Sequence, residues 1–372
     1  MDAFERIRNV FQRPTNERTF AMIAPERAGN RGGTPIEPKK AYVQFRLRRM
    51  RLRYAGFLHK EFYPVVHSFV EVSRKGANRV TVPYVAGPGQ LSELDKGEEQ
   101  VILTQNVDLI GPTPYIGGTV NLAVGLCAAQ AKDYLSNLVG VMGSLSDVLG
   151  TNPLTSVLAI VEPLKGAAES FLGLDGQVQL KIGTTNGFAE PRGDARDNAG
   201  DNTNSDESVL VDGLYALVAV PEKDGWGPWF QWAGGELRVQ FNNGKVTPVE
   251  HDYLVFEITQ SPEMPDWSRL PDLNKKAETV QTVAAKDGLD ADSYREAFAA
   301  LKVAVIESAD LIDSDRVRII RGTEKQAKDL SDRLGEPPDG LGLRGEKATA
   351  LGRAVDAGPS IEMARTLKPE SL

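Results

Sequence analysis

Alternation of apolar and polar residues with a period of two runs through most of the chain between residues 41 and 260. In its first stretch, residues 43–47 alternate, the phase slips at Arg48-Arg49, and residues 50–54 resume the alternation. Because successive side chains of a strand point to opposite faces, a slip of this kind predicts a β-bulge within one strand.

The same period predicts eight further strands, bounded by glycine, proline and asparagine. Asn242-Asn243-Gly244 is a typical turn signal between two of them. Predicted strands do not alternate regularly with predicted helices, and this favours an antiparallel sheet over a parallel one. We therefore expect a mainly β chain with α additions, built on an antiparallel β-sandwich. The further strands are expected at 62–72, 79–86, 100–110, 119–126, 177–182, 208–220, 236–241 and 252–259.

Two apolar segments, 134–149 and 154–172, interrupt the strands and predict an α-hairpin. Charged residues leave uncharged runs of only 13 and 14 residues, which is short of the ~20 that a constitutive membrane span needs. Ser136, Gly140 and Ser144 lie on one helical face, where small side chains let another backbone approach closely. The hairpin either packs inside its own domain or contacts a second copy, another protein or a lipid surface.

The chain divides into four parts by composition. Residues 1–40 form an N-terminal helix and arm, and 41–262 form the β-sandwich domain, with the hairpin inserted at 131–173. After Pro265 the pattern becomes helical, because Tyr294, Phe298, Leu301 and Val305 form one stripe. The helical region is expected at 263–334, followed by a linker and flexible tail at 335–372.

The segment RLRRMRLR at 46–53 holds five arginines in eight residues. Allowing for the phase slip, Arg46 and Arg48 are expected to point the same way as Arg51 and Arg53, and this row could grip phosphate, anionic lipid or an acidic protein surface. Alternatively they pair with the acidic remainder of their own chain. Nucleic acid is disfavoured as a partner, because a nucleic-acid-binding domain is usually basic throughout, whereas this chain has a net charge of −8. The five positions are Arg46, Arg48, Arg49, Arg51 and Arg53.

The segment GWGPWFQW at 225–232 gathers Trp226, Trp229 and Trp232. Exposed, these rings could anchor a partner or sit at a membrane interface; buried, they would form an apolar corner at the entry of a strand.

No catalytic or metal-binding signature is found in the sequence. Cys127 is the single cysteine, and His59, His67 and His251 are the only histidines, which argues against a zinc site. The Asp/Asn-rich stretch 191–208 lacks the residue order of an EF-hand calcium loop and favours a solvated loop, with calcium binding as the weaker alternative. We therefore expect no cofactor, no metal and no enzymatic activity. A hydrolase is the weakest alternative, and it would require a cleft that joins a histidine to a Ser or Asp.

Charge is distributed unevenly, with a net of +10 over residues 1–90 and −18 over the rest. This asymmetry favours internal neutralisation, self-association or an acidic partner. The segment MDAFERIRNVFQR has no apolar stretch typical of a signal peptide, so we expect a soluble, cytoplasmic protein. The sequence thus predicts a protein-binding or assembly subunit, a self-associating scaffold for instance. Its alternative is a membrane-active protein that docks its hairpin or tryptophan loop on anionic lipid.

Overall fold

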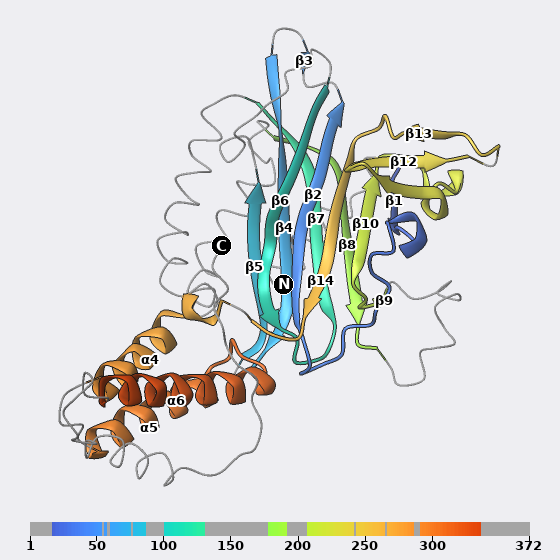
Figure 1. The fold of residues 1–372 in the computed structure, drawn as a ribbon. Coiled ribbons are helices and arrows are strands. Elements are labelled where there is room, and N and C mark those ends of the chain that lie inside the picture. The colour runs from blue at the N-terminus through green and yellow to red at the C-terminus, as the bar shows by residue number, and fades with distance from the viewer. Residues whose placement is uncertain are drawn as a thin grey trace. The chain divides into compact units, whose positions relative to one another are not determined.

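The computed structural model describes residues 17–53, 56–57, 60–75, 77–86, 100–130, 178–191, 207–241, 243–264, 266–285 and 291–335. The chain is rich in strands and divides into two compact units, Met1–Pro262 and Glu263–Leu372. The strands lie in three open sheets, and every strand pairing is antiparallel except that of β8 with β9 (Figure 1). The four-part division predicted above stays a prediction.

The first sheet has five strands in the order β1-β10-β14-β2-β6. Only the last three are long, and they form its centre and one edge. Their bounds are β1 Thr19–Met22, β10 Gly213–Val218, β14 Tyr253–Ser261, β2 Tyr42–Arg53 and β6 Gln100–Pro114.

The second sheet has six strands in the order β3-β4-β7-β8-β9, with β5 paired to β4. Their bounds are β3 Gly56–Phe57, β4 Lys60–Arg74, β5 Ala77–Ala86, β7 Val120–Gln130, β8 Val178–Ala189 and β9 Glu207–Val209. The third sheet is small, with β11 Phe230–Ala233, β12 Glu236–Gln240 and β13 Val246–Pro248, preceded by the short 3-10 turns η3 Glu222–Asp224 and η4 Gly227–Trp229.

Two apolar cores lie on opposite faces of the five-stranded sheet. The larger core joins residues of β2, β10 and β14 to residues of β4, β7 and β8, including Phe45, Tyr215 and Phe188. The smaller core joins the other face of β10 and β14 to β11 and β12 through Leu214, Val255 and other residues. All six residues of β10 are consequently buried, which explains its uninterrupted apolar sequence.

The bulge predicted at Arg48-Arg49 is confirmed. Val255 of β14 pairs with Arg49 and the adjacent Phe256 pairs with Leu47, so Arg48 is the extra residue of β2. The shift allows Leu47 and Met50, which are three residues apart, to point into the same larger core.

The N-terminal arm from residue 17 to 40 docks on its own unit. β1 forms the edge of the five-stranded sheet, η1 (Pro25–Arg27) follows it, and Ile36 is buried in the larger core. Backbone bonds then fasten the arm to the chain just before β10: the Gly33 N–H donates to the Asp212 carbonyl at 2.8 Å, and the Asp212 N–H donates to the Thr34 carbonyl at 3.0 Å.

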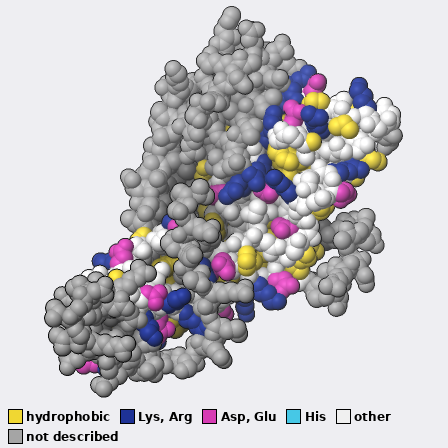
Figure 2. Space-filling view, in the orientation of Figure 1, with side chains coloured by type: hydrophobic (Ala, Val, Ile, Leu, Met, Phe, Trp, Pro, Cys, Tyr) yellow, Lys and Arg dark blue, Asp and Glu magenta, His cyan; other side chains and the backbone are white. Residues whose placement is uncertain are grey.

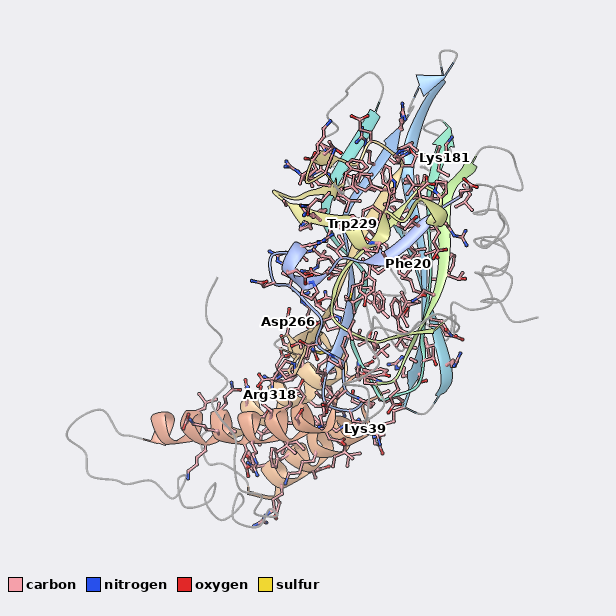
Figure 3. The ribbon with its side chains drawn as sticks, turned by 90° about the vertical axis from the view of Figure 1, so that its right-hand side faces the viewer. Phe20, Lys39, Lys181, Trp229, Asp266 and Arg318 are labelled. Atoms are coloured by element: carbon pink, nitrogen blue, oxygen red, sulfur yellow. The ribbon has the colours of Figure 1, made fainter. Side chains whose placement is uncertain are left out.

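The described residues of the second unit form η5 (Trp267–Arg269) and three helices, α4 Pro271–Ala284, α5 Ala291–Glu307 and α6 Asp313–Gly335. The predicted stripe of Tyr294, Phe298, Leu301 and Val305 is confirmed as the buried face of α5. Asp315, fully buried near the start of α6, accepts the Met264 N–H at 2.7 Å and the Arg318 Nε–H at 2.6 Å (Arg318 is labelled in Figure 3). This carboxylate therefore fixes the beginning of the unit to α6.

We predict that Gly32→Ala will destabilise the first unit by about 3 kcal/mol or more. A Cβ at this position would lie 2.3 Å from the Gly213 Cα, and the backbone has φ +89°. Chemical denaturation of the variant, followed by tryptophan fluorescence, measures the loss.

Gly29→Ala is the matched control, because Gly29 has φ +71° but nothing lies within 4 Å of its added Cβ. It should cost only about 1 kcal/mol of backbone strain. Equal losses in the two variants would show that the close approach of the arm does not matter.

Candidate functional site

The five predicted arginines lie on β2, on the side opposite to the larger core. Residues that alternate with them, such as Phe45 and Leu52, are fully buried in that core, whereas Arg46, Arg48, Arg49 and Arg51 are partly buried and Arg53 is exposed. Figure 2 shows Lys and Arg side chains gathered over the middle of this face, with acidic side chains among them. We call these five residues the arginine strand.

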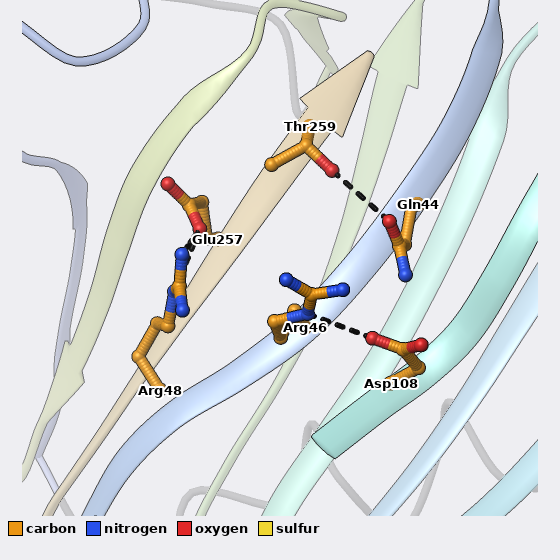
Figure 4. A network of polar contacts seen from close by, with 6 residues as sticks. All are labelled: Gln44, Arg46, Arg48, Asp108, Glu257 and Thr259. Atoms are coloured by element: carbon orange, nitrogen blue, oxygen red, sulfur yellow. Dashed lines mark hydrogen bonds and ion pairs between the residues drawn. The ribbon is translucent and has the colours of Figure 1, made fainter. Parts of the chain in front are cut away.

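The two neighbouring strands supply carboxylates to the arginine strand (Figure 4). Arg46 Nε donates to Asp108 Oδ1 of β6 at 2.8 Å, and Arg48 Nε donates to Glu257 Oε2 of β14 at 2.6 Å. The first pair is open to solvent, with side chains 31% and 41% exposed. The second is largely buried, at 19% and 8%, so the Arg48 guanidinium neutralises a carboxylate that has little access to water.

The remaining arginines bind the small sheet and the loop before β14. Arg49 donates to the Gly235 carbonyl at 2.5 Å and lies 3.7 Å from the Glu236 carboxylate. Arg51 donates to the Val249 carbonyl. At the end of the strand, the backbone N–H of Arg53 donates to Asp252 Oδ1 at 2.5 Å.

These contacts favour the internal role of the arginine strand over a phosphate-binding role. The guanidinium groups of Arg46, Arg48, Arg49 and Arg51 have acceptors within their own chain, and Arg53 is the most exposed of the five residues. Whether any of the five also contacts a partner stays a prediction. The partners Glu257 and Asp108 were missed from the sequence, although a single carboxylate inside the apolar run YLVFEI is itself a signal for a buried cation.

The three tryptophans, which we call the tryptophan corner, have different environments. Trp226 is half-buried and meets Phe241 and His251 edge-on, with ring centroids 5.8 Å and 5.4 Å apart. Trp232 is also half-buried and packs against the smaller core. Trp229 is 36% exposed and lies in η4 (Figure 3).

Trp229 is held in place although it is exposed. The Arg27 guanidinium lies over the indole ring at 5.0 Å and donates a hydrogen bond to the Pro228 carbonyl. Beneath the turn, Gly227 is buried, and a Cβ there would lie 3.1 Å from the Ala21 Cβ of β1. Both the ring and its backbone are therefore fixed by the N-terminal arm.

Other chemistry-bearing residues do not converge on a catalytic arrangement among the described residues. His67 is buried in β4, and burial lowers its pKa to about 4. Cys127 is buried in β7, and burial raises the pKa of its thiol to about 12. Near neutral pH both groups are uncharged, which is the opposite of a thiolate–imidazolium pair.

Several predicted residues lie outside the described residues: Ser136, Gly140 and Ser144 of the hairpin, His59, and residues 192–206 of the Asp/Asn-rich loop. Within the described part of the chain, no group of three or more His, Cys, Asp or Glu residues could hold a metal ion. No described helix combines the length and apolar character needed to cross a membrane. Comparison of the chain with protein families, curated proteins and solved structures yields no match.

We predict that Glu257→Gln will lower the free energy of unfolding by about 3 kcal/mol, because it removes the carboxylate that neutralises the largely buried Arg48 guanidinium. Equilibrium denaturation of the purified chain measures this change. Asp108→Asn removes the matching carboxylate of the solvent-open pair and should cost less than about 1 kcal/mol. Equal losses in the free energy of unfolding would show that the buried Arg48–Glu257 pair stabilises the unit no more than the solvent-open Arg46–Asp108 pair does.

Proposed function

We propose that the chain is a non-enzymatic protein-binding or assembly subunit and that Trp229 is the anchor its partner contacts. The single observation that carries this proposal is an exposed tryptophan already held in one conformation. Rigid, partly exposed aromatic side chains are the residues that most often dominate binding energy. Since the Arg27 contact orders the ring in advance, a partner loses little conformational entropy on binding it.

The surroundings of Trp229 support a protein partner. The described exposed large hydrophobic residues of the first unit are Met22, Trp229, Phe241 and Val246, and all belong to β1, η4 or the small sheet and its loops. Charged residues lie around them, including the exposed Glu26, Glu222 and Asp224. Apolar anchors surrounded by polar residues are the usual composition of a protein interface. An anionic lipid surface is the alternative, to which the acidic residues are poorly suited.

The finer architecture is part of the same proposal: the five- and six-stranded sheets pack face to face as a sandwich. In support, Phe45 of β2 and Phe188 of β8 have ring centroids 6.0 Å apart, and Phe188 meets Tyr215 of β10 edge-on at 5.5 Å. The larger core also draws residues from both sheets. Such a sandwich would be the rigid support on which the small sheet and the tryptophan corner are mounted.

The predicted hairpin at 131–173 would then cover the other face of the six-stranded sheet. On that face Val65, Phe69 and Cys127 are buried, yet they belong to neither core described above. Gly125 of β7 pairs with Gly183 of β8 at the centre of the face, which leaves room for a close-packed helix. The described ends of β7 and β8 that flank this segment are neighbours, because Ala129 pairs with Val178, so both ends of the proposed hairpin would lie at one end of this surface.

Alkylation of Cys127 tests the proposed position of the hairpin. In the unmodified chain we expect very slow reaction with a thiol reagent at pH 8, because the thiol is 3% exposed and its pKa is raised to about 12. Met142→Lys places a charge on the apolar face of the predicted hairpin and should speed the reaction at least about tenfold, if hairpin docking is weakened by ~1.4 kcal/mol or more. Asp147→Lys, which replaces a residue that is already charged, should leave the rate unchanged. Fast reaction in the unmodified chain, or equal rates in all three proteins at unchanged secondary structure, would reject this position.

Affinity capture from extracts of the native host tests the role of Trp229. The full chain should recover a stoichiometric protein partner, and Trp229→Ala should reduce that recovery at least about tenfold, as expected for a hot-spot aromatic residue. Val317→Ser is the control, because Val317 is similarly exposed (37%) but lies on α6 of the second unit and is not one of the apolar residues around Trp229.

Equal recovery by the Trp229→Ala and Val317→Ser proteins would contradict the anchor. If the unmodified chain captures no protein but binds anionic vesicles, and Trp229→Ala abolishes that binding, the membrane alternative is favoured.

A further inference from the structure

Arg321 of α6 carries a buried positive charge without a directly bonded anion among the described residues. Its two terminal nitrogens, Nη1 and Nη2, are shielded from solvent and have no hydrogen-bond acceptor. Arg318 of the same helix shows the usual arrangement, because it donates to the Asp315 carboxylate at 2.6 Å and to the Met264 carbonyl at 2.7 Å. Since a buried charge is strongly unfavourable without a partner, the Arg321 guanidinium indicates a place for an anion.

Two hydroxyl groups of the same unit are also buried without a hydrogen-bond partner. They are Tyr294 OH of α5 and Thr323 Oγ1 of α6, and each residue is 1% exposed. The Tyr294 ring stacks on Phe298, with centroids 5.8 Å apart, and the Lys302 ammonium lies 4.4 Å from the centre of the Phe298 ring. A tyrosine hydroxyl and a lysine ammonium, both able to donate hydrogen bonds, therefore lie beside the same ring.

The carboxylate of Glu324 shows which other side chains lie close by. Burial and, to a lesser extent, the negative charge of Glu324 raise the pKa of Tyr294 to about 12. Burial also raises the pKa of Glu324, whereas three neighbouring cations lower it: Lys302, Arg321 and Lys328. Because the interaction between two charges weakens with distance, all four side chains lie near this one carboxylate.

The charges around Glu324 do not balance. Lys302, Arg321 and Lys328 contribute three positive charges and Glu324 contributes one negative charge, which leaves a net of +2. A phosphate group carries about −1.5 to −2 near neutral pH and offers several oxygen acceptors. A guanidinium can donate to two such oxygens at once, as the two unpartnered nitrogens of Arg321 allow. A single carboxylate would neutralise only half of the excess charge.

We propose that the second unit binds a phosphate group where α5 meets α6. Arg321 donates two hydrogen bonds to it and Tyr294 OH donates a third, while Lys302 and Lys328 supply the remaining positive charge. The anion then gives the buried guanidinium and the buried hydroxyl the partners that they lack within the chain. This site goes beyond the proposed function, whose anchor and hairpin belong to the first unit.

Isothermal titration calorimetry of the purified full chain with inorganic phosphate tests the site, near neutral pH and at an ionic strength held constant with chloride. We expect saturable binding of one phosphate per chain. Arg321→Gln should weaken this binding at least about tenfold, the effect of losing ~1.4 kcal/mol. Arg269→Gln is the control, because it removes the same charge from a side chain of the same unit that is 82% exposed, and it should leave the affinity unchanged.

Two further substitutions separate phosphate binding from a structural role. Tyr294→Phe removes only the hydroxyl and keeps the ring that stacks on Phe298, so it should weaken phosphate binding without unfolding the unit. Glu324→Gln removes the one negative charge beside the site and should tighten phosphate binding. A purely structural contribution of these side chains would not produce opposite changes in affinity.

Thermal unfolding of the phosphate-free chain gives an independent readout. Arg321→Gln should raise the midpoint temperature, because it removes a buried charge that has no bonded partner. Added phosphate should raise the midpoint of the unmodified chain and leave that of the variant unchanged, since a ligand stabilises only the protein that binds it.

Glycerol phosphate, titrated in the same way, distinguishes two sources of the phosphate group. Tighter binding of this ester than of inorganic phosphate assigns the site to a phosphorylated small molecule, and equal or weaker binding assigns it to the free anion; both results support the site. Absence of saturable binding of either probe, or equal affinities in the Arg321→Gln and Arg269→Gln proteins, would overturn the proposal. A lower midpoint temperature for phosphate-free Arg321→Gln would overturn it as well, because the guanidinium would then already have a stabilising partner within the chain.

Discussion

The pairing of Arg48 with Glu257 is the interaction on which the arrangement of the first unit depends. β2 lies between β14 and β6, and its bulge at Arg48 shifts the register with both neighbours at once. Without the bulge, the side chains in either the first or the second half of β2 would point to the opposite face of the sheet. The arginines of that half would then be buried in the larger core. Glu257 stabilises the extra residue because its own side chain is 8% exposed and needs a cation. The pair therefore selects the one register in which all five arginines avoid that core.

The same face of the sheet supports the layer that carries the candidate site. The arginine strand binds the turn before β12 through Arg49 and the loop before β14 through Arg51. From the other side, the N-terminal arm holds η4 through Arg27 and is itself held where Gly32 approaches Gly213. Trp229 is thus an exposed side chain on a turn that the N-terminal arm fixes, and this turn leads into a small sheet that the arginine strand holds. This explains why a cluster of tryptophans leaves one ring at the surface in a defined position.

Much of the sheet structure could be predicted from the sequence, because burial of one face imposes a period of two. The strands at 43–53, 62–72 and 252–259 were found in this way, and the phase slip gave the bulge. β1, β11 and β13 were missed, since strands of three or four residues are too short to show a period. The cluster of three tryptophans could be found in the sequence, but the relative solvent exposure of the three rings could not be predicted. Which ring is exposed depends on Arg27, roughly two hundred residues away in the chain.

The mass of the chain as it exists in its host tests the central claim, that this protein works as a subunit of an assembly. Native mass spectrometry of the protein isolated at physiological salt gives that mass directly. We expect a species heavier than the single chain of 40.4 kDa, containing either another protein or a second copy. A single species of 40.4 kDa at every concentration would contradict it.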